Sequence, residues 1–274
     1  MKTILVPTDF SEVAENALDY AVEIAKITKA KLVLFHVFNV PIVPAEIPIV
    51  IPTDEMEKDA MNSLKKIEKK LQNKHGSKLT IECKSKCGFP VEEINLFAKE
   101  NKVDLIVVGM EGENFLIEKI IGNITTSLIK KAKCPVLAID KHVKFKNIKK
   151  IALACDYNKT DNNTILAPLK ELAQVFESHI FILNVTQELE TVTTVSKAVE
   201  GIKLNHSLQN VNHSFHYAMN EDIIEGINDF VDKMKIDMVV MIPRMHTALH
   251  NLFHEPNSKR MAFHTKIPLL ALHE

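Results

Sequence analysis

The fold is decided by KTILVPTDFS (residues 2–11), in which an apolar run is followed at once by a turn and a serine. The apolar run predicts a buried strand over 2–7. Ser11 offers a cap for a helix whose first turn carries Glu12 and Glu15, acids that suit the positive end of a helix dipole. Apolar residues then follow at helical spacing, at Ala14, Ala17, Leu18, Ala21, Ile24 and Ala25. The stretch therefore predicts a strand followed directly by a helix that covers one face of a sheet.

The same alternation of short apolar runs and helical segments continues along the first half of the chain. We expect further strands at about 31–37, 79–85, 104–108 and 135–139, and helices over about 54–74, from Pro90 and from near Gly122. This pattern predicts right-handed βα units and a doubly wound parallel sheet with helices on both faces. In such a sheet, ligands bind beyond the carboxyl ends of the strands, where the strand order reverses.

The chain repeats its own landmarks in one order. KTILVPTD (2–9) matches KKIALACD (149–156), LVLFHVF (32–38) matches IFILNVT (180–186), VDLIVVG (103–109) matches IDMVVMI (236–242), and KCPVLAI (133–139) matches KIPLLAL (266–272). A period of about half the chain indicates duplication of a whole domain rather than a solenoid of short repeats. We therefore expect two tandem domains, 1–142 and 147–274, in agreement with the length of 274 residues.

The second copy is shorter than the first. The offset between matched positions falls from 148 at Val37 and Val185 to 133 at Asp104 and Asp237, a loss of about 15 residues. The Pro-rich stretch 39–53 is the expected place of the loss.

Three segments at expected carboxyl ends of strands carry possible ligand chemistry. Pro7, Thr8 and Asp9 follow the first strand, Val37 ends the second, and a G-x2-G-x9-G pattern follows the fourth. Glycine lets a ligand approach the main chain closely, and the following helix start offers N–H groups and a positive dipole end. That combination is typical of phosphate binding, although a single G-x-x-G is also an ordinary turn between a strand and a helix.

The spacing of these motifs resembles that of the universal stress protein family. The resemblance covers the first 140 residues through PTDFS, G-x2-G-x9-G and CPVLAI, and extends over 149–274 through hydrophobic landmarks and their order alone. It implies two Rossmann-like domains related to the adenine nucleotide α-hydrolases. Each would have a five-stranded parallel sheet of order 3-2-1-4-5.

The resemblance also implies a nucleotide site in the first domain. Asp9 would accept a hydrogen bond from the ribose or the adenine edge, Pro7 and Thr8 would shape the base pocket, and main-chain groups of Val37 would read the adenine. The phosphates would be held by Gly109, Gly112, Gly122, Asn123, Ile124 and Thr125. The implied cofactor is ATP, with or without Mg²⁺, and no residue of this set is an evident nucleophile or base.

Two features depart from the family pattern. Asn123 stands where Ser or Thr usually follows the third glycine, with Thr125 or Thr126 as possible substitutes. Glu111 and Glu113 lie in the loop that would face a triphosphate, and acids repel phosphate unless they point outward or share a divalent cation. A first domain whose pocket no longer binds nucleotide therefore remains an alternative.

The second copy has lost the phosphate motif. Ile242, Met245, Glu255 and Pro256 replace Gly109, Gly112, Gly122 and Asn123, so ATP is expected in the first domain only. A basic run over 244–260 carries His246, His250 and His254 at helical spacing. These histidines could ligate a metal or form a patch for an anion or a partner, but a solvated helix face is the favoured interpretation, and no metal site is predicted.

Three classes of function follow. The leading one is a regulatory protein of the stress response that binds ATP without dedicated catalysis. The second is an interaction or scaffold protein with the same fold and no ligand, and the third is a slow ATP-hydrolysing enzyme. The pyrophosphate-cleaving α-hydrolases carry a Ser-Gly-Gly loop after the first strand, where this chain has PTDFS, so that chemistry is not expected.

Composition limits the partners and the compartment. Lys and Arg (34) nearly balance Asp and Glu (35), which argues against nucleic acid. No uninterrupted apolar run approaches the roughly 18 residues of a membrane helix, and no signal peptide is evident, so a cytoplasmic protein is expected. The scattered cysteines Cys83, Cys87, Cys134 and Cys155 predict half-buried, reduced side chains rather than a disulfide framework.

The expected sheet edges predict how the two halves of the chain pair with each other. The fifth strand of each copy, 135–139 and 268–272, would leave an apolar edge that invites pairing. The family resemblance implies pairing through this strand. We therefore expect an intrachain pseudo-dimer of the two domains, with a further homodimer conceivable.

Overall fold

The computed structural model of the chain describes residues 1–39, 53–76, 79–110, 123–155, 163–186, 195–243 and 267–273. The first half contains β1 (Thr3–Pro7), α1 (Glu12–Thr28), β2 (Lys31–Phe38), α2 (Thr53–His75), β3 (Ile81–Cys87), α3 (Pro90–Glu100), β4 (Leu105–Met110), α4 (Asn123–Lys131) and β5 (Val136–Asp140). The second half contains β6 (Lys150–Ala154), α5 (Asn163–Phe176), β7 (His179–Thr186), α6 (Val195–Ser207), β8 (His213–Met219), α7 (Ile223–Met234), β9 (Met238–Met241) and β10 (Leu269–Ala271).

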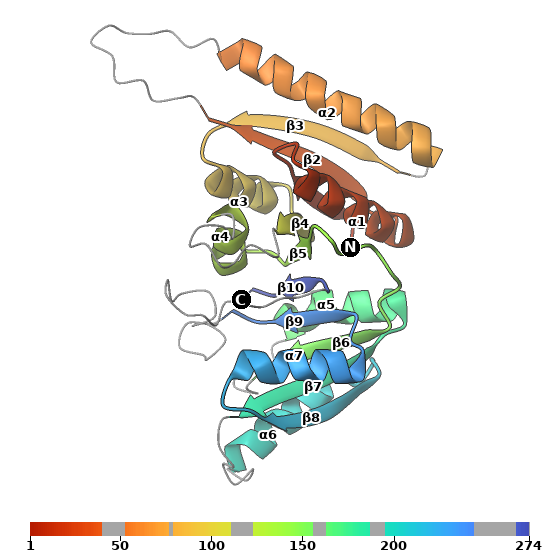
Figure 1. Cartoon of the computed structure of the whole chain (residues 1–274), viewed down its shortest axis with the longest axis vertical. Coiled ribbons are helices and arrows are strands. Elements are labelled where there is room, and N and C mark those ends of the chain that lie inside the picture. The colour runs from red at the N-terminus through yellow and green to blue at the C-terminus, as the bar shows by residue number, and fades with distance from the viewer. Residues whose placement is uncertain are drawn as a thin grey trace, which may run out of the picture.

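All of these strands lie in one ten-stranded sheet of order β3-β2-β1-β4-β5-β10-β9-β6-β7-β8. Pairing is parallel within each half, and each half has the order 3-2-1-4-5, so the predicted fold class is confirmed. The halves meet where β5 pairs antiparallel with β10, with Leu137 opposite Leu270. Figure 1 shows this junction in the middle of the molecule, between the first half above and the second half below.

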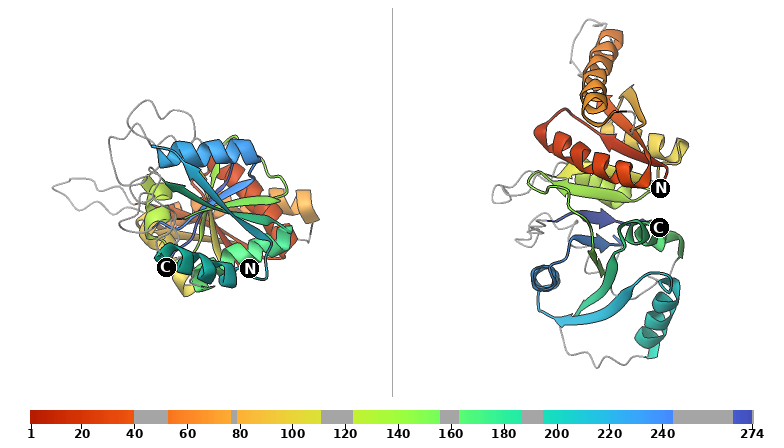
Figure 2. Two further views of the ribbon diagram at one scale, coloured as in Figure 1. Left: turned by 90° about the horizontal axis from the view of Figure 1, so that it is seen from below. Right: turned by 90° about the vertical axis from the view of Figure 1, so that its right-hand side faces the viewer.

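Helices cover both faces of the sheet, and a hydrophobic core lies under each face. One core combines residues of α1, α2, α5 and α6 with alternate strand residues, and the other combines residues of α3, α4 and α7. Figure 2 shows α7 on one side of the second half's strands and α5 and α6 on the other. Both cores include residues of β5 and β10 and so run through the junction. Among the described helices, none is both long and apolar enough to cross a membrane.

Local signals in the sequence set the helix starts. The Ser11 side chain accepts a hydrogen bond from the N–H of Ala14 at 3.2 Å, so the predicted N-cap of α1 is confirmed. Pro90 begins α3, where its missing N–H has no helical partner to lose. The expected strands differ from the observed ones by at most two residues at either end, within the usual uncertainty of element boundaries.

The expected place of the loss, 39–53, falls almost wholly on residues 40–52, which lie outside the described residues, as do residues 187–194 before α6, so it stays a prediction. Helix α2 has 23 residues, whereas its counterpart α6 has 13. Sequence offsets alone do not distinguish a shortened helix from a shortened loop.

A duplicated aspartate secures the start of the first strand in each half. In the first half, Asp104 Oδ2 accepts hydrogen bonds from the N–H groups of Lys2 and Thr3 at 2.6 and 2.8 Å. In the second half, Asp237 Oδ2 accepts from Lys149 and Lys150 at 3.0 and 2.9 Å. The two aspartates, aligned by sequence, therefore have the same structural role.

Near the outer strands β3 and β8, the two halves carry side-chain clusters at matched positions but with different chemistry. In the first half, the carboxylate of Glu82 on β3 lies between two ammonium groups, 2.8 Å from Lys31 Nζ and 3.0 Å from Lys84 Nζ. The register of β7 and β8 places His179, Ser214 and His216 at the equivalent positions.

In this second cluster, Ser214 Oγ lies 2.7 Å from His179 Nε2 and 2.8 Å from His216 Nε2. A hydroxyl group replaces the carboxylate, and two imidazoles replace the lysines. Burial lowers the pKa of His179, and the neighbouring His213 and His216 lower it further.

The lowered pKa of His179 predicts that the free energy of unfolding falls at acidic pH, because His179 then takes up a proton. The unfolded chain binds the proton more readily, so the contribution of His179 to stability is full above its unfolded pKa of about 6.5 and is lost as the pH falls below that value. We expect the free energy of unfolding, measured by urea titration from about pH 7.5 to about pH 5.5, to fall more steeply for the wild type than for His179→Gln. Parallel pH profiles would contradict the assignment.

Candidate functional site

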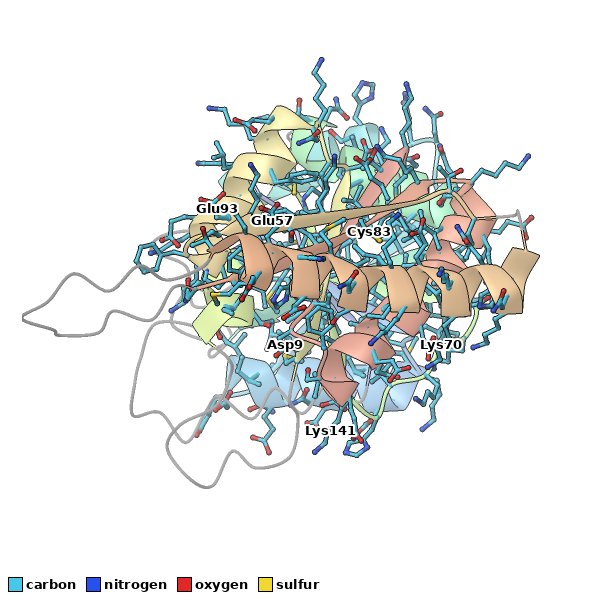
Figure 3. The ribbon with its side chains drawn as sticks, turned by 90° about the horizontal axis from the view of Figure 1, so that it is seen from above. Asp9, Glu57, Lys70, Cys83, Glu93 and Lys141 are labelled. Carbon is cyan, nitrogen blue, oxygen red and sulfur yellow. The ribbon has the colours of Figure 1, made fainter. Side chains whose placement is uncertain are left out.

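A pocket of about 330 Å³ opens in the first half, at the carboxyl ends of β1, β2 and β4. These are the strands around the point where the order 3-2-1-4-5 reverses, which is the expected ligand position in a doubly wound sheet. Residues at the starts of α1, α3 and α4 complete the lining. In Figure 3, Asp9 just before α1, Glu57 on α2 and Glu93 on α3 lie toward the same end of the first half, whereas Lys70 lies toward the other.

The pocket has an apolar part and a polar part. Phe35, Val37, Pro90, Ile94 and Val108 form the apolar part. Thr8, Asp9, Ser11 and Thr125 supply its polar side chains. Ligand pockets commonly combine an apolar slot with a few polar groups that fix orientation. The lining suits a ligand with a largely apolar part and a polar part.

Local hydrogen bonds shape the loop that follows β1. Asp9 Oδ1 accepts from the N–H of Ser11 at 3.0 Å and from its hydroxyl at 2.6 Å. Thr8 Oγ1 accepts from the N–H of Phe10 at 3.0 Å. These hydrogen bonds are those of Asx and ST turns, so side chains of the loop itself stabilise its conformation before α1 begins.

The carboxyl group of Asp9 is held in its charged form. Partial burial raises its pKa, but the hydrogen bonds from Ser11 and the nearby charge of His36 outweigh burial, and the net pKa is lowered. At neutral pH Asp9 is therefore an acceptor only. It suits a hydroxyl or amino group of a ligand and repels a phosphate.

Helix α4 begins at the pocket. Its first residue is Asn123, and Ile124 and Thr125 of its first turn line the pocket. The Thr125 hydroxyl donates to the carbonyl of Gly109 at 2.8 Å, which fixes the helix to the end of β4. N–H groups in a first helical turn have no partner within the helix, and the positive dipole end favours an anion there.

The packing of α1 on β4 requires glycine at position 109. A Cβ built on Gly109 would lie 2.6 Å from Val13 Cγ1, 2.7 Å from the carbonyl oxygen of Val13 and 2.9 Å from its carbonyl carbon. The first turn of α1 thus packs directly on the main chain of β4. Gly109 also lines the pocket, and close approach of a ligand to its main chain stays a prediction.

The structure brings most of the predicted site residues together. The predicted residues that line the pocket are Pro7, Thr8, Asp9, Val37, Gly109, Ile124 and Thr125. Gly112 and Gly122 lie outside the described residues, as do Glu111 and Glu113, and only the main chain of Asn123 is described. Sequence reasoning missed the apolar lining, above all Phe35, Ile94 and Val108, because their spacing is that of ordinary core residues.

Within the described residues, the remaining candidate side chains form no second site. Within the described ranges, no cluster of three or more His, Cys, Asp or Glu side chains could hold a metal ion. The run with His246, His250 and His254 lies outside those ranges, as does Asp156.

The four cysteines, all within the described residues, form no disulfide. Cys83 and Cys155 are buried and Cys134 is partly buried, whereas Cys87 is exposed, contrary to the expectation for it. Burial raises the pKa of Cys83 to about 11 and that of Cys134 to about 12, so both remain protonated thiols at neutral pH.

Known proteins share this architecture and the sequence of the first half. The sequence model of the universal stress protein family matches residues 1–140. A universal stress protein of Methanocaldococcus jannaschii is 36% identical over 143 residues, which cover 51% of this chain and 82% of that protein. A universal stress protein of Bacillus subtilis is 31% identical over 146 residues, which cover 50% of this chain and 97% of its own.

One solved structure matches both halves together. The crystal structure of a universal stress protein from Archaeoglobus fulgidus covers 98% of this chain and 97% of its own, with a TM-score of 0.75 and 17% identity. At this identity the match concerns the fold.

The contact between Gly109 and Val13 predicts that a side chain at position 109 lowers the stability of the protein. Gly109→Ala places a methyl group against the main chain of α1, which cannot rotate away, and should lower the free energy of unfolding by about 1–3 kcal/mol. A Cβ added at Gly201 in α6 would meet no atom within 4 Å. Gly201→Ala should therefore raise stability by about 0.5–1 kcal/mol. Urea unfolding of both variants tests this; equal stability of the two would contradict it.

Proposed function

The chain belongs to the universal stress protein family, and on that premise we propose that its first half binds one adenine nucleotide, ATP with Mg²⁺, as a regulatory ligand in the stress response. The pocket between β1, β2 and β4 supports this proposal, because a single cavity joins an apolar slot to the start of a helix. The slot suits a purine base, and the start of α4 suits a phosphate.

The position of each polar group fits the parts of a nucleotide. The charged Asp9 lies on the side of the β1 loop, where a ribose hydroxyl or an adenine amino group could donate to it. Thr125, in the first turn of α4, lies beside Gly109 at the end of β4. We propose that the phosphates lie at the start of α4 rather than beside Asp9, because like charges repel.

The proposal includes binding without dedicated catalysis. The polar side chains of the described lining are engaged in local hydrogen bonds: Thr8 with Phe10, Asp9 with Ser11, and Thr125 with Gly109. Each bond shapes a turn or secures a helix. A nucleophile would need an adjacent base aimed at the ligand, and these bonds supply none. Slow ATP hydrolysis and a ligand-free scaffold role are the alternatives.

We further infer that the second half binds no nucleotide and forms a permanent pseudo-dimer with the first, as domains 147–274 and 1–142. Ile242, which replaces Gly109, is a buried side chain, and a buried isoleucine does not leave main chain open to a phosphate. The pairing of β5 with β10 and the two shared cores support a fixed arrangement, because the apolar edges of both halves are covered.

Titration of the intact chain with Mg-ATP tests the proposed function. Isothermal calorimetry should give a stoichiometry near one per chain. A ligand that binds only the folded state raises stability by about 2.7 kcal/mol at a hundredfold excess over Kd, so the melting temperature should rise by several degrees. Two equivalent sites would contradict the asymmetry between the halves, and no binding would favour the scaffold alternative.

A matched pair of variants tests where the phosphates lie. Ile124 lines the pocket and is 39% exposed, and Ile202 on α6 is 69% exposed. Ile124→Glu adds a negative charge beside the proposed phosphate position and should weaken Mg-ATP binding about tenfold at low salt. Ile202→Glu adds the same charge to the second half and should leave the affinity unchanged. Equal affinities of the two variants would remove the start of α4 from the site.

A further inference from the structure

The loop that follows β1 is fastened to β2 by a side chain. The carbonyl oxygen of Thr8 lies 2.7 Å from Nδ1 of His36, and since a carbonyl only accepts, the imidazole donates. The main chain of Thr8 also continues the strand ladder, because its N–H donates to the carbonyl of Phe35 at 2.9 Å. Thr8 is thus held through both of its main-chain polar groups at the edge of the pocket.

The second half repeats this fastening with a different residue. Asn184 Nδ2 donates to the carbonyl of Cys155 at 2.9 Å, and the N–H of Cys155 donates to Leu183 at 3.0 Å. Strand register makes the positions equivalent. Pro7 pairs with Phe35 just before Thr8 and His36, and Ala154 pairs with Leu183 just before Cys155 and Asn184. The nitrogen donor is attached to Cγ in both side chains, so both have the same reach.

The residues after Thr8 depend on this anchor. Phe10 adopts φ 67°, a left-handed conformation that is rare for a bulky side chain and persists only where the surroundings hold it. Its N–H donates to Thr8 Oγ1, and its ring lies 4.5 Å from the imidazole of His36, measured between centroids. Release of Thr8 would free the turn that places Asp9 in the pocket.

We propose that His36 is a positioning residue for the nucleotide pocket, acting through the carbonyl of Thr8 on Thr8 and Asp9 without lining the pocket itself. This inference rests on the proposed function of the first half. The essential feature of His36 is its side-chain N–H donor, on a nitrogen attached to Cγ. Asn184 at the equivalent position has such a donor but no ring. The imidazole ring, which also packs against Phe10, is secondary.

Two substitutions separate the donor from the ring. His36→Asn keeps a donor at the same reach and removes the ring, as in the second half. His36→Phe keeps a ring beside Phe10 and removes the donor. Calorimetric titration of the intact chain with Mg-ATP should give a Kd within about twofold of wild type for His36→Asn. For His36→Phe the Kd should rise about five- to tenfold, the effect of one lost hydrogen bond.

Asn184→Leu provides the control, since it removes the equivalent bond where no nucleotide is proposed to bind. Its Kd for Mg-ATP should equal that of the wild type. Amide hydrogen exchange without ligand gives an independent measurement of the loop. Exchange at Phe10, Ser11 and Ala14 should accelerate in His36→Phe, stay slow in His36→Asn, and be unaffected in Asn184→Leu.

The outcomes distinguish the inference from the function on which it rests. If the wild type binds no Mg-ATP, the proposed function fails, and hydrogen exchange alone then decides whether His36 holds the loop. If the wild type binds and His36→Phe binds equally well with unchanged exchange, the positioning role is overturned. Weaker binding by His36→Asn than by His36→Phe would also overturn it, because the ring rather than the donor would then be essential.

Discussion

Helix α1 packs directly on the main chain of β4 because position 109 is glycine. The main chain of Val13 lies so close to Gly109 that any side chain there would displace the helix. That contact fixes the start of α1 over the end of β4, while the ladder from Thr8 to Phe35 fixes the preceding loop to β2. The chain from Thr8 to Val13 is therefore held on both sides of the strand-order reversal, and the pocket is the space left between these attachments and α3 and α4.

The two halves show which features the fold requires and which can change. Asp104 and Asp237 make the same pair of main-chain contacts, and His36 and Asn184 fasten the same loop with different donors. At the outer edges, a carboxylate between two lysines is replaced by a hydroxyl between two histidines. The fold thus requires hydrogen-bond partners for the same main-chain groups in both halves, but it does not require side chains of the same charge. One half could therefore lose a ligand site and keep its architecture.

Much of this architecture could be predicted from the sequence, because duplicated apolar runs report strands directly and Ser11 and Pro90 report helix starts. The place of the residues missing from the second half could not, since a sequence offset counts residues without locating them. Some of the residues that line the pocket could be predicted from the sequence, and others could not. Asp9 and Gly109 stand out as polar or small residues at strand ends, whereas Ile94 and Val108 have the spacing of core residues. Only the arrangement of β4 and α3 in space shows that they border a cavity.

The central claim is that one adenine nucleotide binds in the first half with its base in the apolar slot. Photo-cross-linking of the intact chain with an azido-adenine analogue of ATP, followed by peptide mapping, tests it most directly. The account predicts labelling of segments that contain Thr8, Val37 or Ile94, suppressed by unlabelled ATP. Labelling within residues 147–274 that ATP suppresses, or labelling that ATP does not suppress anywhere, would contradict it.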